Sequence, residues 1–162
     1  MDFVVKPMNA YYARSIAHWK YEGEYAFYNM EYSEALIREL MNGQYVAATG
    51  ENDELAGFYC YGSPAQILSG LHAGVYDHST AIDIGLGMRP DLTGKGIGAD
   101  FVRAGIHYAR DNFYGDQIRL AVAVFNKRAI RAYEKAGFMR GKTFFSEIDG
   151  RQMEFMILHQ PL

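Results

Sequence analysis

A glycine-rich segment at residues 93–98, Thr-Gly-Lys-Gly-Ile-Gly, separates two different sequence patterns and constrains the fold on both sides. Before it, residues 80–88 alternate apolar side chains with Asp83 and two glycines, which predicts a strand. After it, apolar residues recur at helical spacing to about Asp111. A helix that begins at such a turn presents unpaired N–H groups and the positive end of its dipole. The segment therefore predicts a tight corner or an anion-binding turn, and the glycines alone do not decide between them.

The rest of the chain predicts a mixed sheet within one domain, residues 1–162, because no linker, repeat or low-complexity tract divides it. Strands are predicted at residues 3–6, 44–49, 55–61, 80–88, 118–124, 138–147 and 152–158. Helices are predicted to begin at Asn9, Ser33, the glycine segment and Asn126, and to end near His18, Gly43, Asp111 and Gly137. This order is typical of an α/β or α+β fold with helices packed on a sheet.

The composition argues against several classes of partner. Sixteen Lys and Arg against 19 Asp and Glu give a net charge of −3, which disfavours a general nucleic-acid or anionic-membrane binder. The single cysteine, Cys60, excludes an internal disulfide and a cysteine-based zinc site, and we expect no metal. No apolar run approaches 18 residues, and residues 1–7 do not resemble a signal peptide. We therefore expect a cytoplasmic protein without a membrane or nucleic-acid partner.

Two phosphate-binding motifs fit the glycine segment poorly. A Walker A loop needs Ser or Thr after its Lys and Gly five residues before it, but Lys95 is followed by Gly96 and preceded there by Pro90. The dinucleotide pattern G-x-G-x-x-A is met by Gly94, Gly96 and Ala99. However, the next strand lacks the carboxylate that would hold a ribose. A dinucleotide-binding enzyme stays open as a lesser alternative.

Two longer segments carry a more specific resemblance. Residues 84–98 resemble the central acetyl-CoA motif of the GCN5-related N-acetyltransferases, and residues 126–138 resemble the motif that follows it in that family. Together they span roughly residues 81–140 in the order and spacing of the family. The resemblance implies a single-domain acyl-CoA N-acyltransferase fold, with a mixed central sheet flanked by helices on both faces. It also implies acetyl-CoA as co-substrate and a small-molecule or peptide primary amine as acceptor, which attacks the thioester directly.

The resemblance also implies roles for individual residues. The pantetheine and thioester would contact the strand backbone near Leu86 and Met88. The pyrophosphate would bind the turn formed by Thr93, Gly94, Lys95, Gly96, Ile97 and Gly98. Thr93 stands where Gln or Arg is common in the family, and this departure bears on affinity more than on ligand identity, because the contacts are mainly to backbone N–H groups. Asn126 would cap the next helix and reach the pantetheine arm. Tyr133 would act as general acid and protonate the departing thiolate.

The general base is less defined by the sequence. Asp83 shares a strand face with Gly85 and Gly87, where missing side chains would leave room for a substrate. We therefore predict Asp83 as the base, with an ordinary solvated strand residue as the equal alternative. Rival candidates are Glu22, Glu24, His72 and His78. Cys60 lies in an apolar strand pattern and is interpreted as a buried small hydrophobe rather than a nucleophile.

Eight aromatic residues in the segment 11–32 suggest where an acceptor would bind. They are Tyr11, Tyr12, Trp19, Tyr21, Tyr25, Phe27, Tyr28 and Tyr32. They form either a packed amphipathic face or a wall of the acceptor site, where Glu22 and Glu24 would attract a cation. A catalytically silent acyl-CoA-binding or regulatory module, and a protein-interaction role, remain as alternatives to an enzyme. A homodimer is expected only as the common state of the family.

Overall fold

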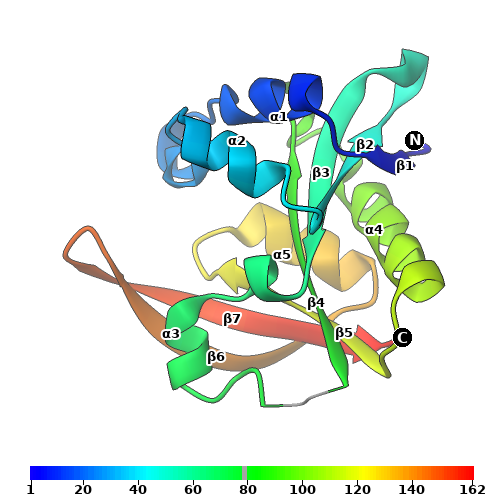
Figure 1. Ribbon diagram of the computed structural model, residues 1–162. Coiled ribbons are helices and arrows are strands. Elements are labelled where there is room, and N and C mark those ends of the chain that lie inside the picture. The colour runs from blue at the N-terminus through cyan, green and yellow to red at the C-terminus, as the bar shows by residue number, and fades with distance from the viewer. Residues whose placement is uncertain (78–79) are drawn as a thin grey trace.

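The computed structural model describes residues 1–77 and 80–162, which form seven strands and five α-helices (Figure 1). The strands are β1 Val4–Pro7, β2 Tyr45–Thr49, β3 Leu55–Tyr61, β4 Ala81–Met88, β5 Gln117–Ala123, β6 Met139–Ile148 and β7 Arg151–Pro161. The helices are α1 Ala10–Ala17, α2 Glu34–Leu40, α3 Leu68–His72, α4 Gly98–Asn112 and α5 Lys127–Lys135. All seven predicted strands and all four predicted helices are confirmed.

The seven strands form one mixed sheet in the order β1-β2-β3-β4-β5-β7-β6. All neighbours are antiparallel except β4 and β5, which run parallel. The parallel pairing covers only three register positions, from Ala81 opposite Gln117 to Asp83 opposite Arg119. Beyond Asp83, β4 pairs with β3 instead, up to Met88. The two strands at the centre of the sheet therefore separate halfway along their length.

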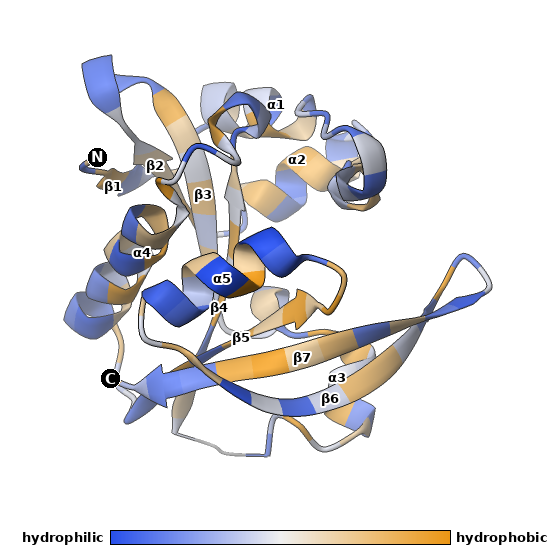
Figure 2. Ribbon diagram, turned by 180° about the vertical axis from the view of Figure 1, so that it is seen from behind, coloured by the Kyte–Doolittle hydropathy of each residue, from blue (hydrophilic) through white to orange (hydrophobic). Residues whose placement is uncertain are grey.

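Helices cover both faces of the sheet, as the predicted fold class requires. On one face α4 and α5 pack on a core that includes Tyr59, Ile118 and Leu158. On the other face α1 and α2 cover β2 and β3, while α3 lies against β6 (Figure 1). Figure 2 shows the first face from the front, with hydrophilic residues on the outer side of α5 and an apolar middle stretch in β7.

Helix α4 is held against the sheet by two buried tyrosines. The Tyr59 hydroxyl donates to the Phe101 carbonyl at 2.6 Å, and the Tyr61 hydroxyl donates to the Gly105 carbonyl at 2.7 Å. A Cβ at Gly105 would lie 2.7 Å from the Tyr59 ring, so glycine is needed for this close approach. These contacts fix the start of α4, and hence the glycine segment, relative to β4.

The local predictions that depend on capping are confirmed. The side chains of Asn9, Ser33 and Asn126 accept hydrogen bonds from the backbone N–H groups of Tyr12, Leu36 and Ala129. The turn at Asp149 and Gly150 has positive φ at both residues, which is the conformation that this dipeptide favours in a hairpin.

Two short elements complete the structure. Within residues 21–32, Gly23–Tyr28 forms a 3-10 segment that contains Tyr25 and Tyr28. Gly23 has φ +61°, so the segment does not continue a regular helix from α1. The short helix α3 lies between β3 and β4 in the chain. Among the described residues, no helix is long and apolar enough to cross a membrane.

Candidate active site

The separation of β4 and β5 opens a cleft of about 840 Å³ through the middle of the sheet. Residues 84–88 of β4 form one wall and residues 120–123 of β5 form the other. The glycine segment, α5 and the 3-10 segment Gly23–Tyr28 complete the lining. Most of the predicted cofactor-binding residues surround this cleft.

The glycine segment forms a turn that leads directly into α4. Gly94 and Gly96 have φ of +72° and +81°, a conformation that favours glycine. A Cβ at Gly96 would meet nothing within 4 Å, so the space above this backbone is open. Helix α4 begins after Ile97 without a side-chain cap. Its first N–H groups are therefore available to an anion that approaches from the cleft.

The predicted cofactor-binding residues divide into two groups. Leu86, Met88, Thr93, Gly94, Gly96, Gly98 and Asn126 line the cleft. Lys95 and Ile97 do not; the Lys95 side chain is exposed away from the lining. The Thr93 hydroxyl donates to the Pro90 carbonyl at 2.6 Å and so stabilises the turn before the glycines. The turn itself therefore offers an anion mainly its backbone N–H groups.

Three cations on α5 line the cleft and were not singled out from the sequence. They are Arg128, Arg131 and Lys135. The Arg128 guanidinium carbon lies 4.1 Å from the centroid of the Tyr25 ring, and a Cβ at Gly94 would lie 3.3 Å from Arg128 Nη1. The spacing of three and four residues, which places side chains on one helix face, was the available signal. Together with the helix start, these residues give one end of the cleft a positive potential.

Tyr133 lies on α5 with its side chain in the cleft lining. The residue is 9% exposed, and its ring packs edge-on against Phe138. Its hydroxyl has no hydrogen-bond partner within residues 1–77 and 80–162. Burial, with a smaller contribution from Tyr28, raises the pKa of Tyr133 above its ordinary value of 10.0. The phenol therefore remains protonated at neutral pH and can donate a hydrogen bond into the cleft.

Asn126 connects α5 to the 3-10 segment. Its Oδ1 accepts from the Ala129 N–H at 3.1 Å, and its Nδ2 donates to the Tyr28 hydroxyl at 3.0 Å. The predicted cap is therefore confirmed, and the amide also orients Tyr28 at the cleft. Contact between Asn126 and a pantetheine arm stays a prediction.

The prediction that Asp83 lies on an open or solvated strand face is wrong. The residue is 4% exposed and does not line the cleft. Both carboxylate oxygens accept from the buried Arg119 guanidinium, with Nη2 to Oδ2 at 3.2 Å, and Oδ2 also accepts from Gln66 at 2.8 Å. Arg119 lies 36 residues away on the parallel strand, so its proximity could not be read from local spacing. A paired and inaccessible carboxylate is poorly placed to deprotonate a substrate amine.

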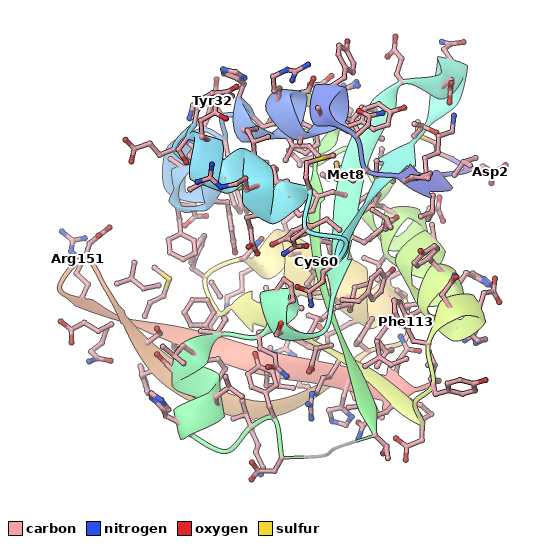
Figure 3. The ribbon with its side chains drawn as sticks, in the orientation of Figure 1. Asp2, Met8, Tyr32, Cys60, Phe113 and Arg151 are labelled. Atoms are coloured by element: carbon pink, nitrogen blue, oxygen red, sulfur yellow. The ribbon has the colours of Figure 1, made fainter. Side chains whose placement is uncertain are left out.

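The space expected beside the strand glycines is also filled. A Cβ at Gly85 would lie 2.6 Å from Cys60 Sγ, and one at Gly87 would lie 2.4 Å from the Phe58 ring. These glycines admit neighbouring protein side chains rather than a substrate. Cys60 is buried on β3 (Figure 3), and burial raises the pKa of its thiol to about 12, which agrees with an inert hydrophobe.

None of the rival bases in the described residues lines the cleft. Glu22 and Glu24 are exposed, as is His72 at the end of α3. His78 lies outside the described residues. The same residues contain no cluster of three metal-ligating side chains.

The aromatic segment divides between the two interpretations. Tyr21, Tyr25, Phe27 and Tyr28 line the cleft, whereas Tyr11 and Tyr32 are exposed elsewhere. The Tyr21 hydroxyl donates to the Met88 carbonyl at 2.7 Å and thereby holds the aromatic segment against the end of β4.

A second, smaller cavity of about 460 Å³ lies on the α3 side of the sheet. Its charged lining residues are Asp77, Lys142 and Arg119, and Arg119 is already paired with Asp83. Its turn glycine, Gly74, follows the end of α3, and no helix begins at its border in the described part of the chain, so the larger cleft is the better candidate for an active site.

Comparison with known proteins agrees with this geometry. The model of the acetyltransferase (GNAT) family matches residues 11–138, so the chain belongs to the GNAT family. Its fold resembles a GNAT-family acetyltransferase from Bacillus anthracis, with TM-score 0.74, 12% identity, and 99% and 95% of the two chains covered. It also resembles AAC(6')-Ib in complex with ribostamycin and coenzyme A, with TM-score 0.71, 18% identity, and 97% and 93% covered.

A sequence relative is mycothiol acetyltransferase from Salinispora arenicola, 35% identical over 92 residues. The match covers 54% of this chain and 30% of that protein. The chain spans about a third of the length of the curated relatives it matches.

Proposed function

We propose that the protein is an N-acetyltransferase that transfers the acetyl group of acetyl-CoA to a primary amine. The observation that carries the proposal is the cleft between β4 and β5, with the glycine turn and the α5 cations at one end and Tyr133 in its wall. Membership of the GNAT family supports the same activity. In addition, AAC(6')-Ib, which shares the fold, is complexed with coenzyme A.

The chain offers suitable groups for each part of acetyl-CoA. The backbone N–H groups at Gly94, Gly96 and the start of α4 would bind the pyrophosphate, with Arg128 and Arg131 adding positive charge. The free edge of β4 from Leu86 to Met88 would pair with the pantetheine amides, because no strand pairs with this edge among the described residues. Asn126 lines the same path.

The transfer requires a bond from the amine nitrogen to the thioester carbon, followed by breakage of the carbon–sulfur bond. We place Tyr133 beside the departing sulfur, where its hydroxyl would stabilise the thiolate by a hydrogen bond. An ordinary tyrosine has a higher pKa than an ordinary thiol, and burial raises the pKa of Tyr133 further, so a retained hydrogen bond is favoured over the complete proton transfer expected of a general acid. The thiolate would then take its proton from solvent.

We also propose that residues 1–162 act as one domain, because the single sheet extends from β1 near the start of the chain to β7 near its end. A cytoplasmic location and a homodimeric state belong to the same proposal. The former rests on the lone free Cys60, and the latter only on the family resemblance.

A catalytically silent acyl-CoA-binding module is the second candidate. One observation favours it: no carboxylate or imidazole among the described residues lines the cleft. If the protein is an enzyme without such a base, the acceptor amine must reach the thioester already deprotonated, or a water molecule must remove its proton.

The test is a screen of acetyl-CoA against diverse primary amines, with coenzyme A release corrected for hydrolysis and acetylated products identified by mass. Amine-dependent release with an acetylated product supports the proposal. Acetyl-CoA binding without transfer to any amine would favour the silent module. Displacement of acetyl-CoA by NAD would favour a dinucleotide enzyme, and binding of neither ligand would overturn a cofactor role.

A further inference from the structure

We infer that the acceptor is an apolar aromatic amine carrying one amino group, and that it reacts as the free base without a carboxylate from the protein. This inference rests on the proposed function and specifies the substrate class of the same cleft. It excludes polycationic amines as preferred acceptors.

The lining of the cleft includes residues from the apolar clusters on both faces of the sheet, and we call the two ends of the cleft its first and second mouths. The glycine turn and α5 border the mouth on the α4–α5 side. The opposite mouth is bordered by Phe27, Ile67, Ile148 and Phe155, which pack in the apolar cluster on the α3 side. The phosphates of acetyl-CoA match the first mouth, so the acceptor must enter through the second.

The second mouth is lined by aromatic rings that support one another. Phe27 packs edge-on against Phe125 with ring centroids 5.9 Å apart, and its centroid is 6.3 Å from that of Phe155. The ring centroids of Tyr28 and Phe125 are 6.1 Å apart. Such a packed wall presents flat apolar surface to a ligand, which favours an aromatic group.

The described lining of the cleft contains no carboxylate that could pair with the ammonium groups of a polycation. Its charged lining residues in the described part of the chain are Arg128, Arg131 and Lys135, all positive. Glu22 and Glu24, which were expected to attract a cation, are exposed outside the lining. Each additional ammonium group would lose hydration in an apolar mouth without gaining a carboxylate partner.

The same absence of a carboxylate defines how the amine reacts. An apolar environment disfavours the ammonium form, so the amine enters with its nitrogen lone pair free. That lone pair attacks the thioester carbon, and the carbon–sulfur bond breaks with its electrons retained by sulfur. The nitrogen loses one proton to water, and the thiolate, held by the Tyr133 hydrogen bond, gains one from solvent. The products are the N-acetylated amine and coenzyme A.

The first experiment compares kcat/KM for 2-phenylethylamine, hexylamine and spermidine at saturating acetyl-CoA. We expect the aromatic amine to exceed spermidine by about 100-fold, since a buried unpaired charge costs several kcal/mol. A preference for spermidine would overturn the inference and leave the proposed function intact. Acetylation of no amine by a protein that binds acetyl-CoA would overturn both.

The second experiment measures kcat/KM against pH for phenylalkylamines whose ammonium pKa values differ. We expect the rising limb of the plot of kcat/KM against pH to move with the ammonium pKa of each acceptor. A rising limb at the same pH for every acceptor would identify a protein base and overturn the free-base mechanism.

A variant pair localises the acceptor. Phe27→Leu should raise the KM for 2-phenylethylamine about tenfold, with the KM for acetyl-CoA unchanged, because it removes one ring from the second mouth. The matched control is Tyr11→Leu, at a tyrosine that is 70% exposed and does not line the cleft. Equal effects of the two substitutions would contradict the placement.

Discussion

The two halves of β4 differ in their neighbours and consequently in their roles. The first half, ending at Asp83, pairs with β5, and the second half, from Ile84 to Met88, pairs with β3. The first half is closed by a buried ion pair, whereas the second has a free edge at the cleft. One strand therefore joins two parts of the sheet and opens a site where it changes partner.

Within the eight residues of β4, the first half therefore contributes to stability and the second half is available for binding. Asp83 and Arg119 occupy the last paired register position before the strands diverge. Gln66 and the Tyr76 carbonyl complete the hydrogen bonds of this pair. The polar groups of the closed half are thus satisfied internally. In the open half no described strand pairs with the edge of β4 at the cleft, where the Met88 carbonyl accepts from the Tyr21 hydroxyl.

The largest expected effect comes from breaking the pair in the closed half. Arg119→Met leaves the Asp83 carboxylate buried and unpaired, so the free energy of unfolding should fall by about 3–5 kcal/mol in denaturant titrations. The double variant Asp83→Leu/Arg119→Met should recover most of that loss. The exposed pair Glu134–Arg140 provides the control, because Arg140→Met should change stability little. Equal effects at the two pairs would contradict a special role for the closed half.

A smaller effect is expected at Tyr133. Tyr133→Phe removes a hydrogen-bond donor and almost no area, so kcat should fall about 10- to 100-fold, the value of a hydrogen bond to a charged group. Calorimetric affinity for acetyl-CoA should stay nearly unchanged. Normal turnover in this variant would remove Tyr133 from the mechanism.

Substitution in the glycine turn tests the anion site at the open end. Gly96→Leu should weaken acetyl-CoA binding at least about tenfold, because a side chain would fill the approach to the turn and disfavour φ of +81°. Gly43→Leu is a matched control, since Gly43 also has positive φ and open space but lies after α2. Comparable loss of affinity in both variants would indicate general destabilisation instead.

The smallest effect is expected for the cations of α5. Arg128→Gln should weaken acetyl-CoA binding about two- to fivefold at low salt, with less difference at high salt, because the guanidinium is partly solvated. Lys142→Gln, in the smaller cavity, should leave the affinity unchanged. A salt-independent loss for Arg128→Gln would point to a packing contribution from its contact with Tyr25.

Local signals made the secondary structure and the glycine turn predictable. Asn126 caps its helix as expected, and Gly94 and Gly96 adopt the conformations for which glycine is suited. Long-range pairing was not predictable in the same way. The environment of Asp83 depends on Arg119, and the space beside Gly85 depends on Cys60 from another strand. Both corrections therefore concern partners that a strand pattern alone cannot identify.

Amide hydrogen exchange with and without acetyl-CoA tests the contrast between the halves of β4 most directly. We predict that the ligand increases protection at residues 86–88 and 94–99 and leaves residues 81–83 unchanged, because the open half and the turn border the cleft without a strand partner there, whereas residues 81–83 pair with β5. Unchanged protection of the glycine turn and the open half in saturating acetyl-CoA would contradict this account.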